Sequence, residues 1–230
     1  MIRDTDVRNR EVRSDIKHLR REQLIEATIS VIARRGFART TLALVAKEAK
    51  LSQGIVHFYF KSKDGLLFET LSYLAAEYET TWKRAVRHVG PDPVAALDAV
   101  IEVDLGLEIC VRKKVAVWVA FWAETRGRSE YRKLCTELSA DYFAQTRDMC
   151  RQIAERGGYT DIDPDNVARG LNAMVDGYWV SLMMDPRAFD RARAKQACRQ
   201  LLAGVFPAEF GPLVGSVEMA GASCGRLKEA

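Results

Sequence analysis

Two stretches in the second half of this 230-residue chain carry aromatic and acidic side chains at spacings that could bind a cation. Trp118 and Trp122 lie four positions apart, and Asp176 lies three positions before Trp179, so each pair would share one side of a helix. A quaternary ammonium has no N–H group to donate, and proteins hold it with aromatic faces and a nearby carboxylate. The candidate ligand-binding residues are Trp118, Phe121, Trp122, Asp176, Tyr178 and Trp179.

The same residues allow a second interpretation. Tryptophans at helical spacing often pack in a hydrophobic core, and Asp176 could pair with an arginine or lie at an interface. A carboxylate in an apolar stretch costs free energy unless it is paired or solvated. Gly177 beside it would let a ligand or another backbone approach closely. The residues alone leave both the cation cage and the core open.

A third stretch, TLALVAKEAKLSQGIVHFYF from Thr41 to Phe60, has the pattern of two short helices joined by a tight turn. Thr41 and Ser52 are suited to cap these helices. One face of the second helix carries Val56, Tyr59 and Phe60. The opposite face carries Gln53, Gly54, His57 and Phe58. Because that opposite face has no obvious core to enter, the pattern predicts a helix-turn-helix unit whose second helix fits the major groove of DNA.

The side chains of the second helix indicate how it would read DNA. Gln53 offers a donor and an acceptor to adenine, Gly54 allows a close backbone approach, and Ile55 can touch a thymine methyl group. Lys61 and Lys63 suit contacts to phosphates, which set the position of the helix without reading the sequence.

Aromatic side chains complete the predicted DNA interface. His57 and Phe58 are expected to brace the sugar-phosphate edge. Tyr59 shares a face with Val56, which predicts a core position with only its hydroxyl near phosphate. The full set of predicted DNA-binding residues is Thr41, Ser52, Gln53, Gly54, Ile55, His57, Phe58, Tyr59, Lys61 and Lys63.

This part of the chain resembles the TetR family of bacterial transcriptional regulators. RREQLIEATISVIARRGFARTT is similar to the family's first helix with its closing glycine and paired threonines, and FYFKSKDGLL to the end of its recognition helix and the start of its fourth helix. The resemblance is specific from Arg20 to Leu71 because several motifs occur in order. It implies that Thr41 and Lys63 contact backbone phosphate. Lys50 departs from the pattern, since the family usually has glycine in this turn, so strain or a different turn is expected there.

A narrower resemblance covers the two aromatic stretches. AVWVAFWAE and MVDGYWVSLM are similar to segments of the choline-responsive repressors of this family, which control glycine betaine synthesis from choline. The resemblance implies choline or betaine aldehyde as effector, a homodimer and a palindromic double-stranded DNA operator. The alternative is a TetR-type regulator that answers a lipophilic or drug-like compound, with the tryptophans as ordinary apolar lining.

The charge of the chain is unevenly placed. Residues 1–63 contain 14 Lys or Arg and 7 Asp or Glu, a net charge of +7, whereas residues 64–230 contain 21 and 24, a net charge of −3. The basic part coincides with the predicted helix-turn-helix, so we interpret it as a surface that faces phosphates and whose DNA binding weakens with salt. The ordinary composition and the lack of a long apolar run predict a globular protein of the bacterial cytoplasm, associated with the nucleoid when bound to DNA.

We predict an all-helical protein with two domains. A flexible arm is expected at 1–17, the helix-turn-helix domain at 18–62, a helical effector-binding and dimerisation domain at 63–210, and a disordered tail at 211–230. A long helix from Ser62 or Lys63 to about His88 would connect the domains and could act as a lever. By the resemblance, the last two helices should form a four-helix dimer interface.

An enzyme that uses the aromatic pocket is the rival from another class. The chain contains no HExxH, GxGxxG or GxxxxGK motif, and its three histidines have no matched nucleophile spacing. Its five cysteines are widely spaced and include no CxxC pair, which argues against a disulfide framework and a zinc site. We therefore predict a regulator without catalytic residues, metal or cofactor.

Overall fold

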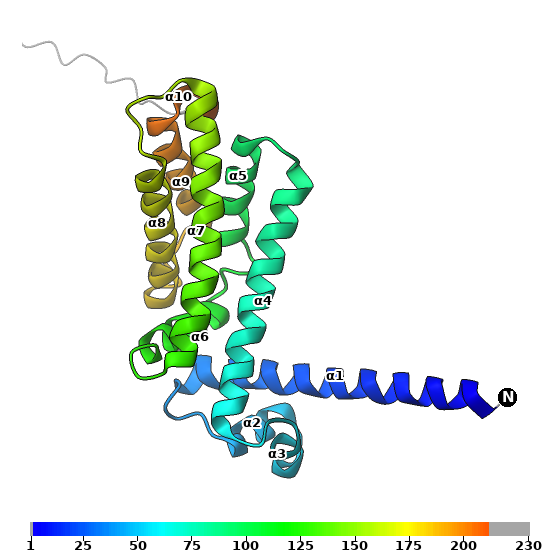
Figure 1. Cartoon of the computed structure of the whole chain (residues 1–230). Coiled ribbons are helices and arrows are strands. Elements are labelled where there is room, and N and C mark those ends of the chain that lie inside the picture. The colour runs from blue at the N-terminus through cyan, green and yellow to red at the C-terminus, as the bar shows by residue number, and fades with distance from the viewer. Residues whose placement is uncertain (1, 212–230) are drawn as a thin grey trace, which may run out of the picture.

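The computed structural model describes the backbone of residues 2–211 and the side chains of residues 16–211. Within this part of the chain the secondary structure consists of helices alone, as the sequence predicts (Figure 1). The predicted disordered tail lies, from residue 212 on, outside the described residues. That segment also contains GASCG (221–225), which has the letters of the GxSxG motif; the motif is meaningful only at a strand-to-helix turn.

The first three helices form the end of the molecule that contains the predicted helix-turn-helix. They are α1 (Ile2–Arg35), α2 (Leu42–Ala49) and α3 (Gln53–Phe60). The predicted caps are confirmed, because the Thr41 hydroxyl accepts from the Leu44 N–H at 3.2 Å and the Ser52 hydroxyl from the Ile55 N–H at 3.4 Å. These caps fix where α2 and α3 begin, and so fix the turn between them.

A helix occupies most of the segment predicted as a flexible arm at 1–17. Helix α1 begins at Ile2 rather than after residue 17, and it projects beyond the body of the protein (Figure 1). The first 35 residues contain no glycine or proline, and Asp4 and Asp6 each precede an arginine by four positions. Such spacing favours a helix even without an apolar face, which is the feature that the sequence prediction relied on.

The remaining helices form the larger domain. They are α4 (Lys63–Val89), α5 (Pro93–Asp104), α6 (Arg112–Glu124), α7 (Ser129–Gly157), α8 (Pro164–Met184), α9 (Arg191–Val205) and the short α10 (Pro207–Phe210). The carboxylates of Asp92 and Asp163 cap α5 and α8, and each of these two helices has proline as its first residue. None of the described helices is long and apolar enough to cross a membrane.

Helix α4 connects the two domains. It rises from the helix-turn-helix beside α5 and α7 (Figure 1), and it packs against both of them. Its start is fixed by Ser62, whose hydroxyl accepts from the Gly65 N–H at 3.0 Å. Its buried face includes Leu67, Leu74 and Tyr78, so one helix contacts both the DNA-binding core and the interior of the larger domain.

A second connection runs through Phe37 in the loop after α1. The Phe37 ring lies edge-on to Phe121 of α6, with ring centroids 5.3 Å apart, and to Tyr131 of α7 at 6.2 Å. Arg128 covers the Phe37 ring at 5.8 Å and binds Asp64 of α4 at 2.9 Å. Apolar packing and an ion pair therefore join the DNA-binding end to α6 and α7.

Candidate functional site

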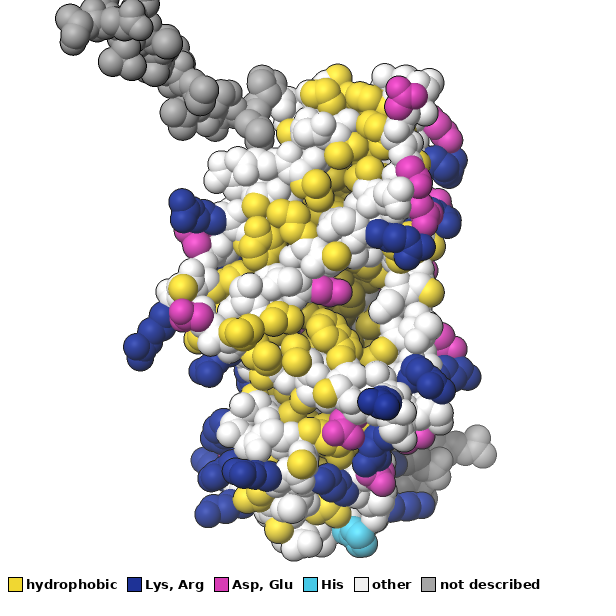
Figure 2. Space-filling model, turned by 90° about the vertical axis from the view of Figure 1, so that its left-hand side faces the viewer, with side chains coloured by type: hydrophobic (Ala, Val, Ile, Leu, Met, Phe, Trp, Pro, Cys, Tyr) yellow, Lys and Arg dark blue, Asp and Glu magenta, His cyan; other side chains and the backbone are white. Residues whose placement is uncertain are grey.

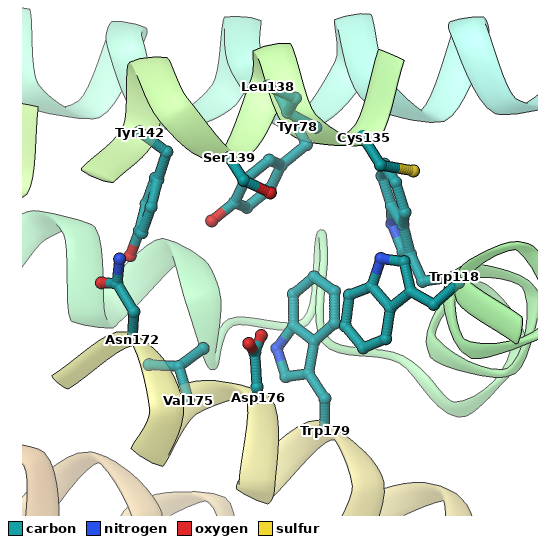
Figure 3. Close-up of a pocket in the computed structure, with 11 residues that line it drawn as sticks. Tyr78, Trp118, Cys135, Leu138, Ser139, Tyr142, Asn172, Val175, Asp176 and Trp179 are labelled. Carbon is teal, nitrogen blue, oxygen red and sulfur yellow. The ribbon is translucent and has the colours of Figure 1, made fainter. Parts of the chain in front are cut away.

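Helices α4, α6, α7 and α8 enclose a cavity of about 130 Å³ in the larger domain (Figure 3). It is lined by Tyr78, Trp118, Trp122, Cys135, Leu138, Ser139, Tyr142, Asn172, Val175, Asp176 and Trp179. Tyr142 and Asn172 lie at one end and Trp118 and Cys135 at the other, with Asp176 and Trp179 on the α8 side. The two stretches singled out in the sequence thus meet at one cavity.

Aromatic rings form most of the cavity wall. Trp122 and Trp179 stack nearly parallel, with centroids 6.1 Å apart and an interplanar angle of 7°. Trp118 lies 6.5 Å from Trp122, and Tyr78 meets Trp179 edge-on at 6.0 Å. Because ring faces carry negative partial charge, a wall of this kind attracts a cation that lacks hydrogen-bond donors.

Acceptor groups lie among these rings. Asp176 is an exposed residue on the α8 side of the cavity, and the protein around its carboxylate raises the pKa of that group by desolvation. The side-chain oxygen of Asn172 is buried and has no hydrogen-bond partner. None of the lining residues is a lysine or an arginine. The cavity therefore offers negative charge and an unused acceptor, and no positive charge that would repel a cation.

A second carboxylate, Asp104, lies behind the wall and was missed in the sequence. It is fully buried, and it accepts hydrogen bonds from the hydroxyls of Tyr78, at 2.7 Å, and Tyr142. The indole N–H of Trp179 donates to its backbone carbonyl at 2.8 Å. Burial raises the pKa of Asp104 to about 7; the two tyrosine hydrogen bonds lower it, and Asp176 raises it further. An aspartate ending the apolar stretch VAALDAVIEVD was the available signal.

Two of the predicted ligand-binding residues do not line the cavity. Phe121 is fully buried on the other side of α6, against Phe37 and Tyr131. Tyr178 points to the surface between α8 and α9. Of the neighbouring residues Tyr178 and Trp179, it is Trp179 that faces the cavity, where its indole N–H donates to the backbone carbonyl of Asp104.

The recognition helix α3 divides its side chains as predicted. Val56 and Phe60 are buried, whereas Gln53, Gly54 and His57 are exposed. A methyl group on Gly54 would meet only the Ser52 hydroxyl, at 3.9 Å, so no internal packing requires a glycine there. This glycine leaves room for something outside the protein to approach the backbone.

The other predicted DNA-binding residues surround that exposed face. Ile55 and Tyr59 are half-buried, and Phe58 is 75% exposed and edge-on to Tyr59. Lys61 is exposed, whereas the Lys63 ammonium lies 3.4 Å from the Ala38 carbonyl, to which it donates. Lys63 is thus directed toward the loop after α1, and Lys61 is the freer of the two lysines.

The turn between α2 and α3 accommodates its non-glycine residue in a left-handed conformation. Lys50 has φ 55° and ψ 39°, and the Leu51 N–H donates to the Ala46 carbonyl at 2.9 Å, which closes α2 as a glycine would. Of the two outcomes expected from the sequence, strain or a different turn, the structure has the usual turn with a strained residue.

Positive charge gathers around this end of the molecule. Residues 49–63 include three lysines and no acidic residue. Figure 2 shows lysine and arginine side chains around the lower, DNA-binding end, below a face of the larger domain on which hydrophobic side chains are prominent. The positively charged end of the molecule is therefore the helix-turn-helix domain, and the larger domain presents the more hydrophobic face.

Both halves of the chain match models of known protein families. Residues 24–70 match the model "Bacterial regulatory proteins, tetR family", and residues 93–207 match "BetI-type transcriptional repressor, C-terminal". The chain is 33% identical to the HTH-type transcriptional regulator BetI of Paraburkholderia phytofirmans over 187 residues, 78% of this chain and 89% of that protein. It is 32% identical to BetI of Paraburkholderia xenovorans with the same coverage.

Solved structures share the fold. A putative transcriptional regulator from Pseudomonas aeruginosa PAO1 has a TM-score of 0.72 at 24% identity, covering 84% of this chain and 93% of that one. A putative transcriptional regulator from Saccharomonospora viridis, solved in complex with choline, has a TM-score of 0.68 at 24% identity, covering 79% and 94%. The relatives are named as transcriptional regulators and not as enzymes. The chain therefore belongs to the TetR family of bacterial transcriptional regulators, in its group of BetI-type repressors.

Proposed function

We propose that this repressor binds a palindromic operator as a homodimer and releases it when a small quaternary ammonium compound, choline or betaine aldehyde, enters the aromatic cavity. The observation that carries the proposal is the lining itself. Trp118, Trp122 and Trp179 form its wall, and Asp176 lies beside them without a lysine or arginine in the lining. A trimethylammonium group binds to such rings by its charge and needs no hydrogen-bond acceptor.

The comparisons support this choice of effector. Relatives that cover most of the chain carry the name BetI, and the Saccharomonospora viridis regulator with the same fold was solved in complex with choline. The free oxygen of Asn172 at one end of the cavity suits the hydroxyl of choline, because it can accept the hydrogen bond that no protein group donates to it.

A long-chain lipophilic effector is the second candidate. Its support is the fold of FadR from Bacillus subtilis, solved in complex with stearoyl-CoA, with a TM-score of 0.66 at 17% identity. The cavity of about 130 Å³, with a carboxylate in its lining, favours the small cation, because a long acyl chain needs a longer apolar channel.

The DNA-binding role rests on the exposed face of α3. Gln53 and Gly54 are placed to meet base edges, and Lys61 to meet phosphate. One helix of this length reads few bases, so a two-fold dimer doubles the recognised site.

Signal transfer would follow the two connections between the domains. Helix α4 carries Tyr78 at the cavity and begins at Lys63, shortly after the recognition helix ends at Phe60. Helix α6 presents Trp118 and Trp122 to the cavity and Phe121 to Phe37. An effector that shifts these helices changes the spacing of the two recognition helices, provided that it binds more tightly to the released state.

Calorimetry with choline, betaine aldehyde and the neutral choline isostere 3,3-dimethyl-1-butanol tests the proposed effector. Choline should bind at least about tenfold more tightly than the isostere, because only the cation gains from ring faces and carboxylates. Replacing the stacked ring by Trp122→Leu should reduce choline binding, whereas Trp82→Phe, outside the cavity lining, should not. Equal binding of choline and the isostere would contradict the proposal.

A further inference from the structure

Three aromatic residues of the cavity wall donate hydrogen bonds to one buried residue, Asp104, which does not itself line the cavity. Asp104 ends α5, and its carboxylate accepts from the phenols of Tyr78 on α4 and Tyr142 on α7. Its main-chain carbonyl accepts from the indole of Trp179 on α8. The bonded partners are 26, 38 and 75 positions away in the chain, so the folded protein assembles this group from four helices.

Ordinary packing does not require a carboxylate at this place. Asp104 is 0% exposed and no lysine, arginine or histidine donates to its side chain within the described part of the chain, so its negative charge has only two phenols to offset it. A buried charge without a counter-charge is costly, so the carboxyl group either takes up a proton or needs a positive charge placed close to it.

We infer that Asp104 is a specificity-determining residue of the effector site, whose buried charge favours a cationic ligand over a neutral one of the same shape. The inference rests on the proposed function and extends it. The Asp104 carboxylate attracts the cation through the layer formed by Tyr78 and Tyr142, whose hydroxyls it also holds by hydrogen bonds. The Asp176 carboxylate attracts the cation from the α8 side of the cavity. A bound cation then lies near two carboxylates.

The charge on Asp104 couples ligand binding to a proton. The ionisable groups that face it are Tyr78 on α4, Tyr142 on α7, Asp176 on α8 and Cys198 on α9, with Cys110 in the loop after α5. Arg191 of α9 donates to the main-chain carbonyls of 105, 106 and 110 rather than to the carboxylate. With a pKa of about 7 in the empty protein, Asp104 is partly protonated at neutral pH, and a cation that enters the cavity displaces that proton.

The test is calorimetry on the full-length protein with choline and 3,3-dimethyl-1-butanol, over about pH 5.5 to 8.5, in two buffers of different ionisation enthalpy. In the wild type, choline affinity should fall about tenfold toward the acidic end, and choline binding near pH 7 should release protons. The neutral isostere should show neither effect. In Asp104→Asn, the preference for choline over the isostere should fall about tenfold at the alkaline end, and proton release near pH 7 should disappear.

Two further variants separate charge from packing. Asp176→Asn removes the other carboxylate and should weaken choline binding while proton release persists, at a somewhat lower pH because the Asp176 charge raises the pKa of Asp104. Tyr142→Phe removes one donor to Asp104, so the pH at which choline affinity falls should move upward, because that hydrogen bond lowers the pKa of Asp104.

The outcomes distinguish this inference from the proposed function. If the wild type prefers choline but a folded Asp104→Asn keeps the same preference and the same proton release, the Asp104 inference is wrong and the proposed effector stands. If Asp104→Asn does not fold, an unmoved pH profile in Tyr142→Phe overturns the inference in the same way. A wild type that does not prefer choline to the isostere contradicts both.

Discussion

Asp104 has no contact with solvent, and at the scale of single residues its ionisation opposes folding. Burial raises the pKa of this carboxyl from its usual value near 3.8 to about 7, so the native state binds the proton more tightly than the unfolded chain does. The contribution of Asp104 to the free energy of unfolding is therefore highest below about pH 4 and falls as pH rises to about 7. The full decrease is about 4 kcal/mol, at about 1.4 kcal/mol for each tenfold change in proton affinity.

Asp104→Asn should remove that pH dependence. Urea denaturation at a series of pH values should show the wild type losing stability between about pH 4 and pH 7, and the variant losing about 4 kcal/mol less over the same range. Asp98→Asn is the matched control, because Asp98 lies on the same helix but is partly exposed and paired with Arg199 at 2.5 Å. Parallel pH curves for wild type and Asp104→Asn would show that Asp104 does not bind its proton as described.

Lys50 is the second residue that lowers the free energy of unfolding, in this case by its backbone conformation. It holds a left-handed conformation at φ 55°, which glycine adopts without strain. Lys50→Gly should therefore raise the free energy of unfolding by about 1 kcal/mol. Lys47→Gly, which removes the same charge from inside α2, should lower it by about 1 kcal/mol. A loss of stability in Lys50→Gly would contradict the strained-turn description.

At the scale of elements, α6 is one of the helices that contact both the cavity and the helix-turn-helix end. Trp118 and Trp122 line the cavity, whereas Phe121 packs on Phe37. Phe37→Leu keeps an apolar side chain but loses the edge-on ring contact. We expect choline affinity to stay within about twofold, while the ratio of operator affinities without and with choline falls toward one. Fluorescence anisotropy with labelled operator DNA measures that ratio, and an unchanged ratio would show that this contact does not transmit the signal.

The recognition helix α3 should separate two kinds of DNA contact. Lys61→Ala should weaken operator and random DNA alike and reduce the slope of log affinity against log salt by about one. Gln53→Ala should weaken the operator by about 1 to 3 kcal/mol with little effect on random DNA or on the salt slope. The same result for both variants would argue against the assignment of base and phosphate contacts.

The helices that the sequence predicts best are those whose ends have local signals. Helix starts are marked by residues within three positions of the groups that they cap. The predicted caps Thr41 and Ser52 are confirmed, and the Asp-Pro pair that begins at Asp163 is a signal of the same kind. The start of α1 was not predictable from apolar spacing, because its first half has none. The range and length of α4 were predictable from Ser62 and the Gly90-Pro91 stop.

Only some of the cavity residues could be predicted from the sequence, for a physical reason. The spacing of Trp118, Trp122 and Asp176 shows that they share helix faces, but which face meets the cavity depends on the neighbouring helices. That is why the sequence did not show that Phe121 lies on the other side of α6, away from the cavity. Asp104 was missed because its partners come from three other helices, and sequence distance carries no sign of their meeting.

At the scale of the whole molecule, the outer face of α8 is the surface that we propose packs against a second copy of the chain. Ala173 and Gly177 are exposed there, and Val180 and Met184 are exposed hydrophobic residues at 36% and 77%. A side chain at Gly177 would meet nothing within 4 Å in its own chain, so the face is flat rather than filled. Two such faces can pack closely, as a two-fold dimer requires.

Ala173→Arg should break this dimer without unfolding the protomer. The new charge would lie between two apolar faces, whereas the same change at exposed Ala140 of α7 serves as the control. Size-exclusion chromatography with light scattering should find a monomer for Ala173→Arg and a dimer for Ala140→Arg, and operator affinity should fall at least about a hundredfold for the monomer alone. A stable Ala173→Arg dimer would exclude this face as the interface.

The central claim is that a cation in the aromatic cavity weakens operator binding. The most direct measurement titrates choline against a complex of the dimer with the DNA upstream of its own coding region, at constant ionic strength, beside equal concentrations of 3,3-dimethyl-1-butanol and of sodium chloride. We predict saturable loss of operator binding with choline alone. Loss of binding that is equal for choline and sodium chloride, or no loss with choline, would contradict the account.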